Sequence, residues 1–183
     1  MTYLWNLLYV TAGILLLPIL LWQRYVGGKR RAGWSAKLLG NVTLPNAQRQ
    51  APNAQIWLHA VSVGEVNLLA PLVKLIECEQ PGWQLYLTVG TVTGYELAQK
   101  KYPNLALSYA PLDFSWAVAR AIKRIKPDLV VLVELEVWPN LIAGVTQRGI
   151  PLAVINGRLS ERSFRGYRRF RWLLGSTFRR LSL

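Results

Sequence analysis

From residue 55 onwards, short apolar runs alternate with segments that have the periodicity of a helix. The apolar runs predict strands near 55–62, 84–89, 105–109, 128–134 and 151–156. The intervening segments predict helices near 65–78, 94–101, 115–126 and 138–148, with an arginine-rich helix after Ser160. Alternation of this kind is typical of parallel strands joined by right-handed helical crossovers. The sequence therefore predicts an α/β fold over residues 55–183, with a Rossmann-like, doubly wound and mostly parallel sheet.

The amino-terminal segment has a different character, because Thr2 to Gln23 contains no charged residue. An apolar stretch of this length predicts a helix that crosses a bilayer, and a hydrophobic surface anchor is the alternative. Basic residues follow directly, and the next acid is Glu65, so the positive-inside rule places the following domain in the cytoplasm. We expect a transmembrane anchor over 1–23 and a basic juxtamembrane segment and loop over 24–54.

The chain is strongly basic, with a formal net charge of +13. Beyond the juxtamembrane cluster, eight arginines and a single acid, Glu161, lie between Arg158 and Arg180. Clusters of this kind bind nucleic acid, anionic lipid or phosphorylated substrates. The apolar anchor favours an anionic membrane surface as the partner and argues against nucleic acid.

The single cysteine and the single histidine restrict the redox and metal chemistry of the chain. Cys78 has no second cysteine for an internal disulfide, and its apolar helical surroundings predict a small buried side chain. His59 lies inside the first strand, where a hydrogen-bonded core histidine is the expected state. Because acids and histidines do not cluster, the sequence predicts no metal site.

Polar residues follow four of the predicted strands. Along the chain they are Ser62, Gly64 and Glu65; Thr91 and Thr93; Glu134 and Glu136; and Asn156, Arg158, Ser160 and Arg162. The carboxyl ends of parallel strands meet at one edge of the sheet, and ligands bind in the crevice outside that edge. We therefore expect these residues to lie along one rim of the domain.

Each group on this rim has a structural alternative to a functional role. Glu65, after a tight turn at Gly64, is either a general base or a first-turn acid that complements the helix dipole. Thr93 is expected to form a helix cap or turn rather than to contact a ligand. Glu134 has either a structural role or a role in contacting substrate. The structural role, which is helix capping or pairing with Arg158, explains it at least equally well. The arginines suit phosphate recognition, and a solvated basic face is their alternative.

The same four segments resemble one family. H-A-V-S-V-G-E, the T-x-T-G loop, E-L-E-x-W-P-N and N-x-R-L-S-E-R-S with a following R-G-Y-R-R look like the amino-terminal half of 3-deoxy-D-manno-octulosonic acid (Kdo) transferases. Those proteins are membrane-anchored glycosyltransferases of lipopolysaccharide synthesis. The resemblance implies a GT-B enzyme of the inner membrane, whose amino-terminal domain binds a lipid A precursor as acceptor. A second Rossmann-like domain then binds the donor, CMP-Kdo.

The resemblance also implies roles for individual residues. Glu65 is the general base that deprotonates the acceptor hydroxyl as this attacks the anomeric carbon of Kdo, and CMP leaves with inversion. No metal or other cofactor is needed. Near this base, Glu134 and Glu136 shape the site, and Ser62 and Gly64 position the loop. The residues implied near the acceptor or the cleft are Arg158, Ser160 and Arg162.

The domain that binds CMP-Kdo in the family has no counterpart in these 183 residues. We therefore expect a fragment, or an acceptor-binding half that works with a separate donor-binding domain, and little activity for the chain alone. The alternative is a non-catalytic, membrane-bound module that binds a phosphorylated glycolipid.

Overall fold

A computed structural model describes residues 2–25, 32–43, 54–135 and 137–181. Within these residues, five parallel strands form one sheet in the order β3-β2-β1-β4-β5. The strands are β1 (Gln55–Ala60), β2 (Gln84–Val89), β3 (Ala106–Tyr109), β4 (Leu129–Val133) and β5 (Leu152–Ile155). From β1 the chain adds β2 and β3 on one side, and it then returns to add β4 and β5 on the other side of β1. The topological switch point therefore lies between the neighbouring strands β1 and β4. The predicted α/β fold with a parallel sheet is confirmed.

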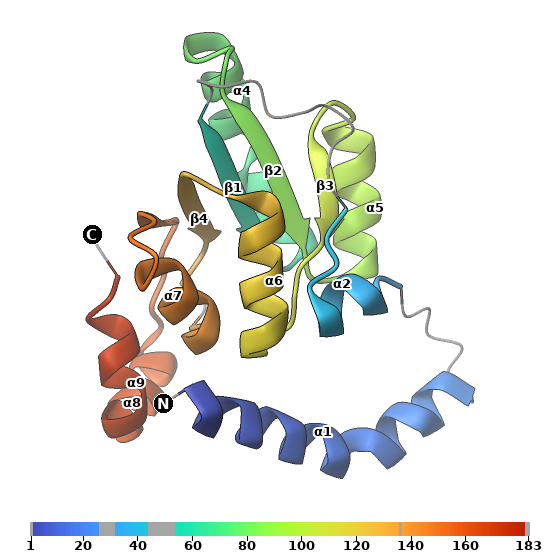
Figure 1. Ribbon diagram of the computed structural model, residues 1–183, viewed down its shortest axis with the longest axis vertical. Coiled ribbons are helices and arrows are strands. Elements are labelled where there is room, and N and C mark those ends of the chain that lie inside the picture. The colour runs from blue at the N-terminus through green and yellow to red at the C-terminus, as the bar shows by residue number, and fades with distance from the viewer. Residues whose placement is uncertain (1, 26–31, 44–53, 136, 182–183) are drawn as a thin grey trace.

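Helices cover both faces of the sheet (Figure 1). One face carries α3 (Val63–Leu68), α4 (Ala70–Glu79) and α5 (Val92–Lys101), and the other carries α6 (Ser115–Ile125) and α7 (Pro139–Thr146). The helix predicted over 65–78 is two helices, with Leu69 between them. Pro71 lies in the first turn of α4, where the missing N–H of a proline costs no helical hydrogen bond.

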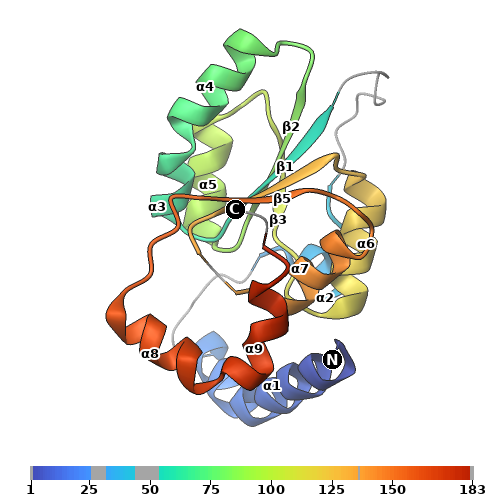
Figure 2. The same cartoon turned by 90° about the vertical axis from the view of Figure 1, so that its left-hand side faces the viewer.

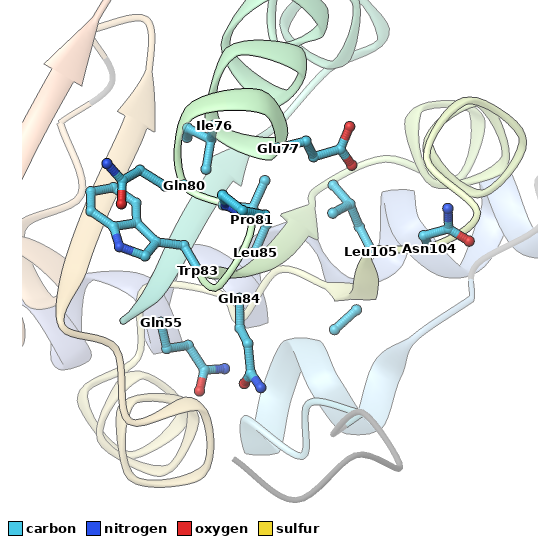
Figure 3. A pocket seen from close by; sticks show the side chains of 11 residues that line it. Gln55, Ile76, Glu77, Gln80, Pro81, Trp83, Gln84, Leu85, Asn104 and Leu105 are labelled. Carbon is cyan, nitrogen blue, oxygen red and sulfur yellow. The ribbon is translucent and has the colours of Figure 1, made fainter. Parts of the chain in front are cut away.

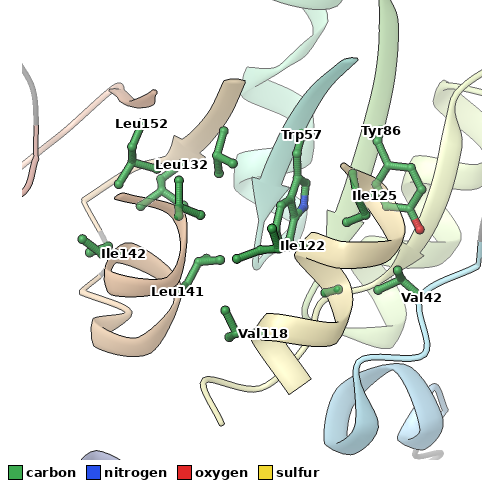
Figure 4. Close-up of a cluster of buried hydrophobic side chains, with 13 residues drawn as sticks. Val42, Trp57, Tyr86, Val118, Ile122, Ile125, Leu132, Leu141, Ile142 and Leu152 are labelled. Carbon is green, nitrogen blue, oxygen red and sulfur yellow. The ribbon is translucent and has the colours of Figure 1, made fainter. Parts of the chain in front are cut away.

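The core consists of two apolar layers, one on each face of β1. Trp57 lies in the layer between the sheet and α6 and α7, together with Ile122 and Leu141 (Figure 4). Leu58 points to the opposite layer, where it packs with Val66 of α3 and neighbouring side chains. Every residue of β1 is buried, as a central parallel strand that is covered on both faces requires.

The amino-terminal helix α1 (Thr2–Tyr25) lies across the end of the domain toward which the strands run (Figure 1). Among the described residues, we find no helix with both the length and the apolar character needed to cross a membrane. The transmembrane anchor predicted over 1–23 is therefore not supported. The first turns of α1 are attached to the globular domain instead, because Asn6 and Tyr9 form hydrogen bonds to Ser115 and Asp113.

Further helices lie at the same end of the molecule as α1. These are α2 (Trp34–Leu39), α8 (Glu161–Arg169) and α9 (Arg171–Phe178), of which α8 and α9 are seen beside α1 in Figure 2. The predicted arginine-rich helix after Ser160 is thus two helices, separated at Phe170. The predicted segment 24–54 lies partly outside the described residues. In its described part, the end of α2 packs closely on α6, because a Cβ at Gly40 would meet the Ala117 carbonyl oxygen at 2.0 Å.

Candidate functional site at the carboxyl edge of the sheet

Ser62 and Glu65 form a capping box at the start of α3, directly after β1. The Glu65 N–H donates to the Ser62 hydroxyl at 3.4 Å, and Glu65 Oε1 accepts from the Ser62 N–H at 3.1 Å. Glu65 Oε2 accepts from the Val61 N–H at 2.8 Å, and the side chain is only 3% exposed. The structural alternative for Glu65, an acid in the first turn of a helix, is therefore present. Its role as a base stays a prediction.

Gly64 does not form the tight turn that the sequence predicts. It lies within the first turn of α3 and is not among the glycines with positive φ. A Cβ at this position would meet the Ser62 hydroxyl at 3.6 Å, which is ordinary van der Waals contact. The chain changes direction through the extended backbone of Ser62, whose φ and ψ are −119° and 169°, so the turn does not require glycine.

After β2, Thr91 caps the start of α5, because its hydroxyl accepts a hydrogen bond from the Gly94 N–H at 3.2 Å. The prediction that Thr93 forms this cap is wrong. Thr91 keeps an extended backbone at the helix start and so reaches Gly94, whereas Thr93 lies inside the first turn and is exposed. A Cβ at Gly94 would meet the Val89 side chain at 2.8 Å and the Ser62 carbonyl carbon at 3.4 Å. The Thr91 N–H donates to the Val61 carbonyl at 3.1 Å, so the loops after β1 and β2 are in contact.

Glu134 and Asn156 follow β4 and β5, and both have left-handed backbone angles, with φ of 71° and 52°. This conformation costs a non-glycine residue about 1–3 kcal/mol, and it recurs at functional sites as well as at helix caps, as at Lys126 after α6. The Asn156 side-chain amide donates to Glu134 Oε1 at 3.4 Å. The alternative of a Glu134–Arg158 pair is not seen among the contacts of the described residues, in which Asn156 is the partner of Glu134 and Arg158 is exposed.

The last segment of the rim continues into α8. Ser160 caps this helix by accepting a hydrogen bond from the Ser163 N–H at 3.2 Å. Arg158 is exposed before the helix begins. Glu136 and the side chain of Arg162 lie outside the described residues.

The order of the strands brings the polar segments to one edge. Segments 61–65, 90–94, 134–135 and 156–160 follow β1, β2, β4 and β5, which are neighbours in the sheet. The Thr91 N–H donates to the Val61 carbonyl, and Asn156 donates to Glu134. The expected rim is thus present in the fold, with its residues joined in two groups.

His59 is buried in β1 beneath this edge, with 3% of its surface exposed. Its Nδ1 lies 3.0 Å from the Thr88 hydroxyl, while Nε2 has no hydrogen-bond partner among the described residues. The ring meets Trp138 edge to face, with 5.9 Å between centroids. Burial lowers the His59 pKa to about 4, so the ring is neutral at pH 7. The predicted core histidine is therefore buried, but only one of its nitrogens is satisfied.

Asp113 and Asn140 are 4% and 3% exposed, and the sequence did not predict a role for either side chain. Asp113 caps α7, because its carboxylate accepts from the Asn140 N–H at 2.9 Å and from the Leu141 N–H at 2.7 Å. Burial raises the Asp113 pKa to about 6, and these N–H donors oppose the shift. The available signal was local: Asp113 stands two residues before a predicted helix, and Asn140 ends the E-L-E-x-W-P-N segment.

A pocket of about 340 Å³ opens at the opposite, amino-terminal edge of the sheet (Figure 3). Glu77, Trp83, Gln84 and Asn104 are among its lining residues, which include none of those that the sequence assigned to the rim. This pocket is therefore separate from the candidate site.

Two other expectations concern cysteine and metal chemistry. Cys78 is exposed on α4, so the prediction of a buried side chain is wrong. The side of α4 that packs on the sheet carries Val73, and Cys78 falls on the other side of the helix. In the part of the chain that the structure describes, no three His, Cys, Asp or Glu side chains are grouped to hold a metal ion.

Residues 29–183 match the family described as "3-Deoxy-D-manno-octulosonic-acid transferase (kdotransferase)". The chain is 39% identical over 130 residues to a bifunctional glycosyltransferase/methyltransferase of Fusobacterium nucleatum, an alignment that covers 69% of this chain and 20% of that protein. It is 34% identical over 145 residues to the 3-deoxy-D-manno-octulosonic acid transferase of Haemophilus influenzae. That alignment covers 79% of this chain and 33% of the Haemophilus protein. Among solved structures, MurG of Acinetobacter baumannii aligns over 55% of this chain and 33% of the MurG chain, at 19% sequence identity. The TM-score of 0.43 is too low for a conclusion about fold or function.

The parallel sheet and its polar carboxyl edge define an α/β domain with a Rossmann-like strand order. The chain belongs to the 3-deoxy-D-manno-octulosonic-acid transferase family. It spans a third or less of the length of the two curated relatives described above.

Proposed function

We propose that this chain binds the acceptor of a Kdo transfer reaction at the carboxyl edge of its sheet. The observation that carries the proposal is the gathering of the family-like segments along this one edge. The acceptor is a phosphorylated lipid A precursor, and the reaction belongs to lipopolysaccharide synthesis. CMP-Kdo is bound by a second Rossmann-like domain, so that the two domains form a GT-B enzyme.

Glu65 is the general base of the proposed reaction. The acceptor hydroxyl oxygen forms a bond to the anomeric carbon of Kdo while the bond from that carbon to the phosphate oxygen of CMP breaks. The hydroxyl proton passes to Glu65, CMP leaves with the bonding electrons, and the anomeric centre is inverted without a metal. A carboxylate has about four lone-pair sites, so the bonds from Val61 and Ser62 leave acceptor capacity on its oxygens. These N–H donors support the proposal by fixing the orientation of the base.

The other rim residues hold the acceptor. The left-handed backbone of Glu134 supports a role in shaping the site, and Asn156 orients its carboxylate. Exposed Arg158 offers a planar guanidinium to a phosphate of the acceptor. Glu136, Arg162, Thr91 and Thr93 belong to the same proposed site through their place in the family-like segments.

The end of the molecule that carries α1, α8 and α9 faces the membrane in this proposal. Large apolar side chains are exposed there, including Ile14 and Leu15 of α1, Phe164 of α8 and Trp172 of α9. Basic side chains lie on α8 among these apolar groups. Exposed apolar surface next to arginines suits a membrane with anionic lipids. The proposed location is the cytoplasmic surface of the inner membrane.

A second function is favoured by the burial of Glu65. Both of its carboxylate oxygens accept hydrogen bonds in the capping box, and the side chain is 3% exposed. A residue in this state is also what a non-catalytic module needs to hold α3 in place. The alternative is therefore a membrane-bound module that binds phosphorylated glycolipid.

A pair of variants separates these functions. Kdo transfer from CMP-Kdo to a lipid A precursor is measured with the chain and a donor-binding domain from a family member. Glu65→Gln should reduce the rate at least about 100-fold, because general base catalysis typically contributes 10²–10⁴-fold. Ser62→Ala removes the hydroxyl of the same cap and keeps the carboxylate, so it should cost about 1 kcal/mol of stability and slow transfer much less than Glu65→Gln does.

Equal transfer rates for the two variants would contradict the base assignment. Glycolipid binding without transfer by the wild-type chain in this mixture would favour the non-catalytic module. The chain without an added donor-binding domain should give no transfer above background, and measurable transfer would contradict the proposed division between domains.

A further inference from the structure

Asn6 of α1 is hydrogen-bonded to the first turns of two helices of the domain. Its Nδ2 donates to the Ser115 hydroxyl at 2.7 Å, and its Oδ1 accepts from the Ser115 N–H at 3.0 Å. The same Oδ1 accepts from Asn140 Nδ2 at 3.2 Å. A single side chain of α1 therefore joins the amino-terminal turns of α6 and α7.

Tyr9, three residues further along α1, makes a second attachment. Its hydroxyl donates to Asp113 Oδ2 at 2.9 Å. Burial, followed by the charge of Asp113, raises the Tyr9 pKa, so the hydroxyl stays a proton donor. The Tyr9 ring stacks on Trp5 and meets Phe114 edge to face, with centroid separations of 5.9 and 6.0 Å. The side chain thus combines a charge-assisted hydrogen bond with aromatic packing.

Asn140 and Asp113 connect these attachments to the candidate site. Asp113 accepts the Asn140 and Leu141 N–H groups, and Asn140 Nδ2 donates to the Asp113 carbonyl at 2.5 Å. Asn140 is the last residue of the E-L-E-x-W-P-N segment, whose first residue is Glu134. Asn140 is 3% exposed, and its Nδ2 is shared between Asn6 and Asp113, whereas its Oδ1 has no hydrogen-bond partner among the described residues.

The exposure of α1 changes abruptly after this attachment. Trp5, Asn6 and Tyr9 are partly buried, whereas residues 10–19 are all exposed and mostly apolar. A helix that is apolar on every side is stable only when other apolar material covers it. The attached turns therefore lie at one end of a helix whose residues 10–19 are exposed.

We infer that Asn6, Tyr9, Asp113, Ser115 and Asn140 form a polar junction that sets the direction in which α1 leaves the domain. In this inference Asn140 is a positioning residue for α1, and the W-P-N part of the segment attaches the helix rather than binding substrate. The inference does not depend on the proposed transfer reaction.

The direction of α1 is measured by electron-spin distance spectroscopy on the full chain, bound to vesicles of phosphatidylethanolamine and phosphatidylglycerol. Spin labels are attached at Ile14→Cys on α1 and Lys123→Cys on α6, both of which are exposed. Cys78 is exposed and is replaced by serine so that it takes no label. We expect a single narrow distance distribution for the otherwise native chain.

Asn6→Ala with Tyr9→Phe should broaden this distribution at least two-fold, because the pair removes the side-chain hydrogen bonds of α1 to the junction and keeps the Tyr9 ring. Tyr3→Phe with Thr11→Ala is the matched control on exposed positions of the same helix, and it should leave the distribution unchanged. Both pairs lie on α1 and leave the sheet and its core layers intact.

A broad distribution in the native junction, or no broadening in Asn6→Ala with Tyr9→Phe, would overturn the inference. Asn140→Ala provides an independent check of the role of the asparagine. It should broaden the same distribution, and a variant that kept the distribution narrow but lost binding to a lipid A precursor would make Asn140 a substrate ligand instead.

Discussion

Two buried titratable side chains, His59 and Asp113, act on stability in opposite directions over the same range of pH. Burial lowers the His59 pKa from 6.5 to about 4, so the unfolded chain binds this proton more tightly than the folded one. The His59 contribution is present above pH 6.5 and is lost as the pH falls toward 4. Burial raises the Asp113 pKa from 3.8 to about 6, so its contribution is greatest below pH 3.8 and declines as the pH rises to about 6.

His59→Phe should expose this opposition. Each shift corresponds to about 3 kcal/mol of unfolding free energy, so the two largely offset each other between pH 4 and 6. Urea unfolding at pH 4 and pH 6.5 gives the unfolding free energy of the wild-type chain minus that of the variant. We expect this difference to increase by about 3 kcal/mol with rising pH. The same comparison with Asp113→Asn should change in the opposite sense, and a difference that did not vary with pH would contradict the buried neutral state of His59.

Single residues were predictable where their partners are close in the sequence. Glu65 lies in the first turn of a helix, as one of its two expected roles requires, and its S-x-x-E spacing from Ser62 is that of the capping box which the structure adds. The partners of Asp113 and Asn140 include Asn6 and Tyr9, which lie more than 100 positions away. No local pattern indicates such contacts, so the sequence does not predict the polar junction.

At the scale of elements, the strands were predicted within two residues of their observed ends. Buried parallel strands need continuous apolar runs, and the run over Leu129–Val133 shows this plainly. Helix boundaries were less well predicted, because they depend on capping geometry. The break before Pro71 and the choice of Thr91 over Thr93 both follow from local backbone angles, which apolar periodicity does not specify.

The two threonines of the loop after β2 give a test at this scale. Thr91→Ala should destabilise the domain by about 1 kcal/mol, because the Gly94 N–H loses its capping oxygen. Thr93→Ala removes the same atoms from an exposed position inside the helix, so its unfolding free energy should stay within about 0.5 kcal/mol of wild type. Equal losses in chemical unfolding, or a larger loss for Thr93→Ala, would contradict the observed cap.

For the whole molecule, the sequence indicated a parallel sheet with a polar edge, but it did not indicate that α1 is attached to the domain. Apolar composition favoured a bilayer span, whereas Asn6 and Tyr9 attach the helix to the domain. The resulting arrangement places α1 and α8 at the end of the domain toward which the strands run (Figures 1 and 2). A membrane at that end would present a lipid-bound acceptor to the rim, which connects the proposed attachment with the proposed site.

The most direct test of acceptor binding uses the 183-residue chain and vesicles of matched negative surface charge. One set contains a phosphorylated lipid A precursor, and the other contains phosphatidylglycerol. We expect at least about ten-fold tighter binding to the precursor, a difference of about 1.4 kcal/mol, because the rim recognises the sugar and its phosphates as well as the charge. Equal affinity for the two vesicles would contradict the account, since it would leave only non-selective attraction between a basic protein and an anionic surface.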